Sequence, residues 1–84
     1  MLHIDEVKWR GGYCLELHFD NGQCKTVDVF PLLTGPVFEP LHDVARFADV
    51  SIDPVARTVV WPNGADLAPE ALHSLAGLAP TQRP

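Results

Sequence analysis

Apolar positions alternate along the first third of the chain, as they do in half-buried strands. Residues 13–19 alternate strictly between apolar side chains and others, and this period of two predicts a strand with one buried face. Residues 2–10 follow the same pattern less regularly, which predicts a strand that contains a bulge. The apolar members of the first stretch are Tyr13, Leu15, Leu17 and Phe19.

The Asp-Asn-Gly sequence at 20–22 is typical of a hairpin, and residues 23–29 supply the next strand. Residues that pair across antiparallel strands share a face. A two-residue turn would place Leu15 opposite Asp28 and mix the faces. A three-residue loop, with its glycine left-handed, places Leu15 opposite Val27. The sequence therefore predicts the three-residue loop.

Residues 30–41, here called the proline-rich segment, combine three prolines with six apolar side chains. The prolines predict irregular structure. A solvated loop would not carry so many apolar residues, so we expect the segment to lie across the sheet or against another chain. Complete burial within the monomer is the competing interpretation. The residues expected at an interaction surface are Phe30, Leu32, Val37, Phe38 and Leu41.

The second half of the chain predicts four short elements, joined by turns. They are a helical turn at 42–47, strands at 49–52 and 58–61, and a helix at 69–76 that begins with a proline and stops at Gly77.

The last strand runs into the sharpest local signature of the chain, which predicts a structural turn toward the final helix. Its proline ends the strand, its Asn-Gly pair supplies a positive φ at low cost, and its aspartate can bond the backbone at the exit. Trp61, like Trp9, is expected to anchor the core. The residues of this turn motif are Trp61, Pro62, Asn63, Gly64 and Asp66.

Together these elements predict an α+β fold. We expect a small antiparallel sheet of about five strands, with a proline-rich crossover, a short helical turn and a short C-terminal helix. Residues 1–78 are expected to form a single domain and residues 79–84 a flexible C-terminal tail.

Composition narrows the function classes. Hydrophobic residues make up 46% of the 84 residues and charged ones only 20%, which favours a globular domain with a partner or with self-association. Eleven acidic residues against six basic ones disfavour direct nucleic acid binding and suit a basic protein partner. The chain has no run of about 20 apolar residues to cross a membrane and no secretory signal, so a cytoplasmic location is expected.

Four ordered stretches carry a family resemblance, namely Leu17–Gly22, Val27–Leu33, Val37–Asp43 and Thr58–Leu67. Together they resemble the bacterial domain of unknown function family 2442. The resemblance implies a compact α+β fold and no established activity. It also implies that some relatives carry an additional DNA-binding domain. Other relatives are implied to have an antitoxin-like or accessory role beside a toxin-like protein. Ala68 stands where the family often carries an acidic helix cap.

Two groups of side chains could carry chemistry. His18 is predicted to lie opposite Cys24 and beside Glu16, a combination of ligands that suits zinc. Cys14 lies four residues from His18, about 13 Å along the strand. This distance is too long for Cys14 to bind the same metal ion. An ordinary solvent-facing strand is the favoured interpretation, so no metal and no cofactor are predicted. His42 with its neighbour Asp43 could act as a base, but no nucleophile motif accompanies them.

We therefore predict a non-enzymatic protein-interaction module, with a role such as an antitoxin-like or accessory partner in a two-gene bacterial system. A protein partner or a homodimer is expected. The alternative is a small enzyme or metal-binding protein that uses His18, Cys24 or His42.

Overall fold

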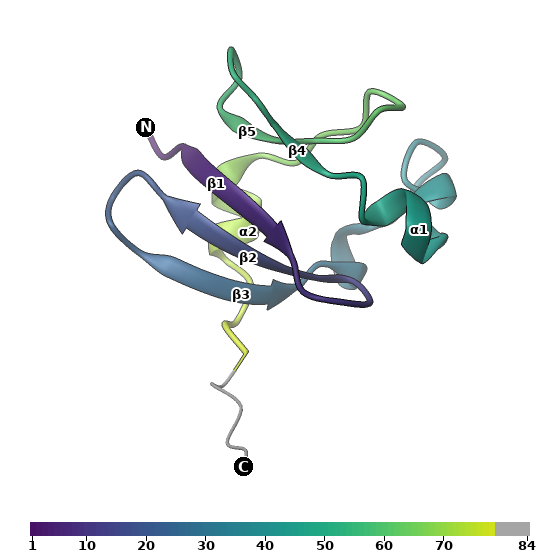
Figure 1. Ribbon diagram of the computed structural model, residues 1–84, viewed down its shortest axis with the longest axis horizontal. Helices are drawn as coiled ribbons and strands as arrows, with labels where there is room; N and C mark the ends of the chain where they lie inside the picture. The colour runs from purple at the N-terminus through teal and green to yellow at the C-terminus, as the bar shows by residue number, and fades with distance from the viewer. Residues whose placement is uncertain (79–84) are drawn as a thin grey trace.

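The computed structural model describes residues 1–78 (Figure 1). This part of the chain contains five antiparallel strands and two short helices. The predicted tail at 79–84 lies outside the described residues. The strands form two sheets, in the order β1-β2-β3 and β4-β5, rather than the one sheet expected. The strands and helices are β1 (Ile4–Trp9), β2 (Cys14–Phe19), β3 (Cys24–Asp28), α1 (Val44–Phe47), β4 (Ser51–Asp53), β5 (Thr58–Val60) and α2 (Pro69–His73).

The hairpin of β2 and β3 has the predicted register. Leu15 lies opposite Val27. The backbone N–H of Phe19 donates to the carbonyl of Gln23 at 2.8 Å, which leaves a loop of three residues between them. Gly22 closes this loop with φ +90°, a conformation that glycine adopts at low cost. The parity of the apolar faces was therefore sufficient to choose the loop length.

A bulge in β1 reconciles its irregular pattern with a single buried face. Ile4 and Val7 are three residues apart and would face opposite sides of a regular strand. The register shifts between Ile4 and Glu6, so both apolar side chains face the same side. At the bulge, the backbone N–H of Ile4 donates to the carbonyl of Arg57 at 2.9 Å, which joins β1 to the β4–β5 hairpin.

One hydrophobic cluster fills the space between the inner face of the three-stranded sheet, the two helices and the end of β5. Helix α2 lies behind this sheet and α1 lies at the end where β1 and β3 terminate (Figure 1). The largest fully buried side chains are Trp61, Phe47, Ile4, Leu15, Leu17, Leu72, Val27, Val29 and Val59.

The proline-rich segment is more regular than predicted. It contains two 3-10 turns, Phe30–Leu32 and Glu39–His42, each with a proline in its first turn. The first backbone N–H groups of a helical turn have no hydrogen-bond partner within the turn. A proline at such a position therefore loses no hydrogen bond, and it can start the turn instead of preventing it. The prediction that the prolines exclude regular structure is therefore wrong.

Two further expectations need correction. Trp9 is 43% exposed rather than buried, because it ends β1, a strand at the edge of the sheet. Helix α2 ends at His73 rather than at 76. The N–H of Ser74 still bonds back into the helix, and Gly77 follows three residues later.

Candidate functional site

The proline-rich segment is partly buried and partly exposed. Leu33 and Leu41 are each only 2% exposed and belong to the core. The side chain of Leu41 mostly fills the monomer's own interior, so it offers little area to a partner. Phe30 and Val37 are 46% and 49% exposed. The remaining two members of the expected surface, Leu32 and Phe38, pack half-buried against the core.

The exposed ring of Phe30 rests on two other rings. Its centroid lies 4.9 Å from that of Tyr13 and 5.2 Å from that of His42. The hydroxyl of Tyr13 in turn donates to the backbone carbonyl of His42. Phe30 is thus held against a partly open aromatic cluster rather than projecting freely into solvent.

The turn after β5 is tied directly to the proline-rich segment. The Asn63 side chain donates from Nδ2 to the carbonyl of Val37 at 3.0 Å and accepts the N–H of Ala65 on Oδ1 at 3.1 Å. Gly64 has φ +88°, as the Asn-Gly signature predicts. The long-range bond to Val37 has no signal in the sequence, because it joins residues 26 positions apart.

Within residues 1–78, the predicted hydrogen bond between the Asp66 side chain and the backbone of this turn is not present. Asp66 contributes through the backbone, in an isolated antiparallel bridge with Val60. Asn63 performs the side-chain role that was assigned to Asp66. The last strand ends at Val60, and Pro62 follows one residue after Trp61.

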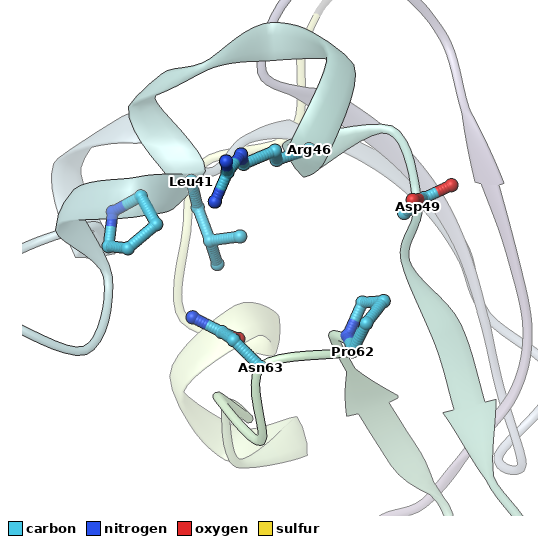
Figure 2. A pocket seen from close by; sticks show the side chains of 6 residues that line it. Leu41, Arg46, Asp49, Pro62 and Asn63 are labelled. Carbon is cyan, nitrogen blue, oxygen red and sulfur yellow. The ribbon is translucent and has the colours of Figure 1, made fainter.

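A hollow of about 210 Å³ lies between this turn and the residues around α1 (Figure 2). Its walls are mainly apolar, with Arg46 and Asp49 supplying one charge of each sign. We call it the groove. Its lining residues are Pro40, Leu41, Arg46, Asp49, Pro62 and Asn63.

His42 and Asp43 do not form a catalytic pair. Asp43 caps α1 by accepting the N–H of Ala45 on its side chain at 3.0 Å. The Nε2 atom of His42 faces the carbonyl of Leu33 at 2.8 Å, so this nitrogen carries the proton and donates it. His42 and Glu39 both line a second, more open hollow beside the proline-rich segment. The side chains of His42 and Asp43 thus serve the local structure.

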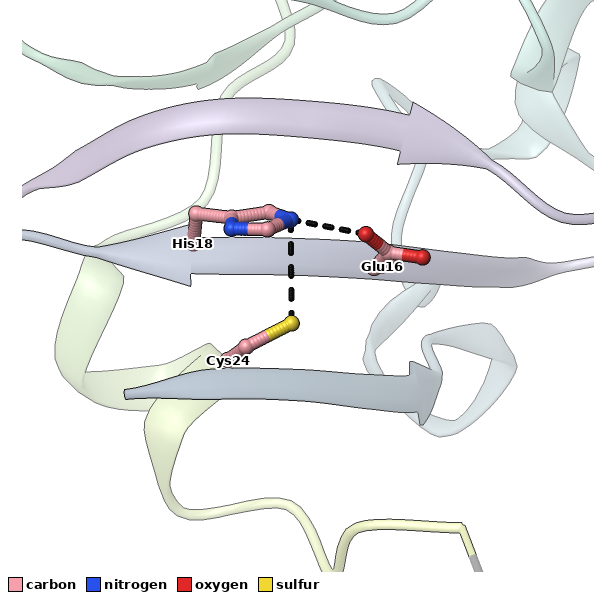
Figure 3. Close-up of side chains that lie close together, drawn as sticks. All are labelled: Glu16, His18 and Cys24. Atoms are coloured by element: carbon pink, nitrogen blue, oxygen red, sulfur yellow. Dashed lines mark hydrogen bonds and ion pairs between the residues drawn. The ribbon is translucent and has the colours of Figure 1, made fainter. Parts of the chain in front are cut away.

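The outer face of the three-stranded sheet brings three potential ligands together. His18 lies opposite Cys24, as predicted. The Nε2 atom of His18 is 2.7 Å from Oε2 of Glu16 and 3.6 Å from Sγ of Cys24 (Figure 3). Among the described residues, these three form the one group of at least three such side chains with ligand atoms within 4.8 Å of one another.

Two neighbours frame this cluster. Arg10 donates from Nε to Oε1 of Glu16 at 2.8 Å, which leaves Oε2 for His18. The hydrogen bonds from His18 and then Arg10 lower the pKa of Glu16, so it is ionised near neutrality. Cys14, on the same face, pairs with Asp28 instead, and burial followed by the charge of Asp28 raises the pKa of its thiol.

The fold and these surfaces define a small α+β domain, and comparison with known proteins gives its family. The profile of a family described as "Protein of unknown function (DUF2442)" matches residues 4–76. The chain belongs to this family, and the resemblance drawn from its motifs is confirmed.

One solved structure is similar to the chain. It is the crystal structure of a putative DNA binding protein from Nitrosomonas europaea, which is 27% identical, with a TM-score of 0.66 over 74% of this chain. The match spans only 41% of that protein's length. No curated protein matches the chain significantly. Within residues 1–78, no helix has the length and apolar character needed to cross a membrane.

Proposed function

We propose that this chain is a non-enzymatic protein-interaction module, which binds a partner protein through the proline-rich segment and the groove beside it. The observation that carries the proposal is the exposure of Phe30 and Val37, at 46% and 49%, in a segment whose backbone is fixed to the core. Exposed apolar side chains on a rigid support are typical of contact surfaces.

The segment is organised before it binds anything. Asn63 bonds the carbonyl of Val37, and His42 bonds that of Leu33. The ring of Phe30 packs against that of Tyr13 in a tilted arrangement. Ordering a loop on binding costs free energy, and a loop that is already ordered avoids most of that cost. An aromatic residue held in this way is also the kind of anchor that dominates the energy of many interfaces.

The size of the groove favours a protein ligand over a small-molecule substrate. Its volume of about 210 Å³ lies below the range of roughly 300–1,000 Å³ that is usual for small-molecule sites. A hollow of this size suits one or two side chains of a partner. Arg46 and Asp49 at its walls offer both signs of charge for orienting them.

Charge favours a basic protein over nucleic acid as the partner. The net charge is −5. Within residues 1–78, Lys8, Arg10, Arg46 and Arg57 each lie in an ion pair with a carboxylate. The putative DNA binding protein that resembles this chain has more than half of its length outside the match, so its described property supports no DNA-binding proposal for these residues. A basic partner fits the antitoxin-like or accessory role.

Affinity capture from the native host tests the proposal. The baits are the wild type, Phe30→Asp and Val37→Asp, with Val55→Asp as the matched control. Val55 is 91% exposed in the turn between β4 and β5, away from the proline-rich segment. We expect the wild type and the control to capture the same protein, and both segment variants to recover at least about tenfold less, the loss typical of an interface anchor.

Equal recovery by all four baits would place the interface elsewhere and overturn the proposal. Sedimentation of the purified chain at micromolar concentration identifies the case in which the partner is a second copy. In that case Phe30→Asp is monomeric while the wild type and Val55→Asp are dimeric. DNA binding by the purified chain in a mobility-shift assay would show that the partner is nucleic acid rather than a protein, and would contradict the proposal.

A further inference from the structure

Three donor atoms converge on one point above the outer face of the three-stranded sheet. Glu16 and His18 project from β2, and Cys24 projects from the neighbouring strand β3 (Figure 3). Alternate residues on one strand, together with the residue opposite on the next, are the closest neighbours that a sheet offers. Here all three ligand atoms lie within 4.8 Å of one another.

The arrangement is not a proton relay of the Cys-His-Glu kind. A relay needs the thiol at one ring nitrogen of histidine and the carboxylate at the other. In this protein the same atom, Nε2 of His18, faces both Oε2 of Glu16 at 2.7 Å and Sγ of Cys24 at 3.6 Å. A single nitrogen cannot donate its proton to the carboxylate and accept one from the thiol together. A cation in the place of that proton would satisfy all three groups.

We propose that Glu16, His18 and Cys24 bind one divalent transition-metal ion of the zinc class. With bonds of about 2.3 Å to sulfur and 2.0–2.1 Å to nitrogen, a tetrahedral zinc ion holds these two atoms about 3.6 Å apart. The observed separation of Nε2 and Sγ is 3.6 Å. The carboxylate oxygen needs to withdraw by only about 0.7 Å to reach the corresponding nitrogen–oxygen distance.

The surroundings support a metal ion at this position. Arg10 holds Oε1 of Glu16, so that Oε2 points toward His18. Partners that fix a ligand in this way contribute substantially to metal affinity. Three protein ligands leave a fourth position for water or for an atom of a partner. The thiolate and the imidazole select zinc-class ions over magnesium and calcium, which prefer oxygen.

Titration of the reduced, tag-free protein with Co²⁺ and with Zn²⁺ tests the site. Cobalt bound to a thiolate gives a ligand-to-metal charge-transfer band, so its appearance reports the bond to sulfur. We expect one equivalent of Co²⁺ to produce the band and one equivalent of Zn²⁺ to abolish it. Magnesium should have no effect.

The chain supplies a matched cysteine control. Cys24→Ser should remove the band and weaken zinc binding at least about tenfold. Loss of a residue that only orients a metal ligand already weakens binding by about this factor, so loss of a ligand itself should cost at least as much. Cys14→Ser, on the same face of the sheet, should keep both. His18→Gln should weaken binding similarly, whereas His3→Gln should not. Circular dichroism of each variant without metal shows that the fold is retained.

Two results would overturn the proposal. One is the absence of a saturable one-to-one site for Zn²⁺ or Co²⁺ in the folded wild type. The other is equal binding by the wild type and the Cys24 and His18 variants, which would mark the metal as adventitious. The readout is independent of the partner-capture experiment, because none of the three ligands lies in the proline-rich segment.

Discussion

The two tryptophans occupy similar positions in the chain and very different positions in the protein. Trp9 is the last residue of β1, and Trp61 directly follows β5. Each begins a tight, glycine-containing turn, and each indole N–H donates to a backbone carbonyl. For Trp9 the acceptor is Gly12, three residues away, at 2.9 Å. For Trp61 it is Phe47, 14 residues away, at 2.8 Å.

The difference between the two tryptophans shows that the burial of a side chain depends on which other parts of the chain pack against it. Trp61 packs against the rings of Phe47 and Phe38, at centroid distances of 5.6 and 6.4 Å, and is 2% exposed. Trp9 is paired with the buried residue Leu15, so its side chain faces the inner side of the sheet. It is nevertheless 43% exposed, at the end of an edge strand.

The largest expected effect is the loss of the buried indole. Trp61→Ala should lower the free energy of unfolding by about 3–5 kcal/mol, since it leaves a cavity and an unpaired carbonyl on Phe47. Trp9→Ala should cost less than about 1 kcal/mol, as is usual for partly exposed positions. Urea denaturation followed by circular dichroism measures both. Equal costs would show that the end of β1 is covered by a second copy or by another protein.

The next effect concerns the turn that holds Trp61 in place. Gly64→Val should lower the free energy of unfolding by about 1–3 kcal/mol, because a β-branched residue is strained at φ +88°. The strain alone sets this cost, since an added Cβ would meet no atom within 4 Å. Thermal and urea denaturation measure the change.

Gly77→Ala is the control for this substitution. Its φ lies outside the left-handed region, and the new Cβ would lie 3.5 Å from Lys25, an ordinary contact. It should therefore leave the stability nearly unchanged. A fully stable Gly64→Val protein that has lost its partner would instead assign the turn to binding.

Local patterns were sufficient to predict much of the fold. The parity of apolar residues predicted the register of Leu15 with Val27, and the irregular pattern of β1 predicted its bulge. The division into two sheets was not predictable in this way. The two sheets meet through the hydrogen bond of Ile4 to Arg57, residues that are 53 positions apart and share no sequence signal.

In the candidate sites, too, local features were predictable from the sequence and tertiary contacts were not. The position of His18 opposite Cys24 follows from strand register, and so the cluster with Glu16 was recognisable in the sequence. The convergence of both partners on one nitrogen of His18 depends on side-chain rotamers, which a pattern does not contain. The groove depends on the approach of the turn at Asn63 to the proline-rich segment, a tertiary contact.

The smallest expected effect lies at the start of β1, at the opposite end from Trp9. Asp20 accepts the backbone N–H of His3 at 3.2 Å and contacts its ring at 3.0 Å. These bonds lower the pKa of Asp20 below its ordinary value of 3.8. A lowered pKa means that the folded state favours the charged carboxylate. Its contribution to stability is therefore present above the pKa of the unfolded state and is lost as the pH falls through the lower, folded value.

Asp20→Asn isolates this contribution, because it keeps an oxygen for the N–H of His3 and removes only the charge. The difference between wild type and variant in free energy of unfolding should be present near pH 5 and should shrink as the pH falls below the ordinary pKa of Asp20. The effect should be small, since water screens exposed pairs. Asp49→Asn, at an exposed position in the groove, controls for the loss of a negative charge alone. A difference between wild type and Asp20→Asn that does not change with pH would show that the start of β1 is held by the backbone bonds alone.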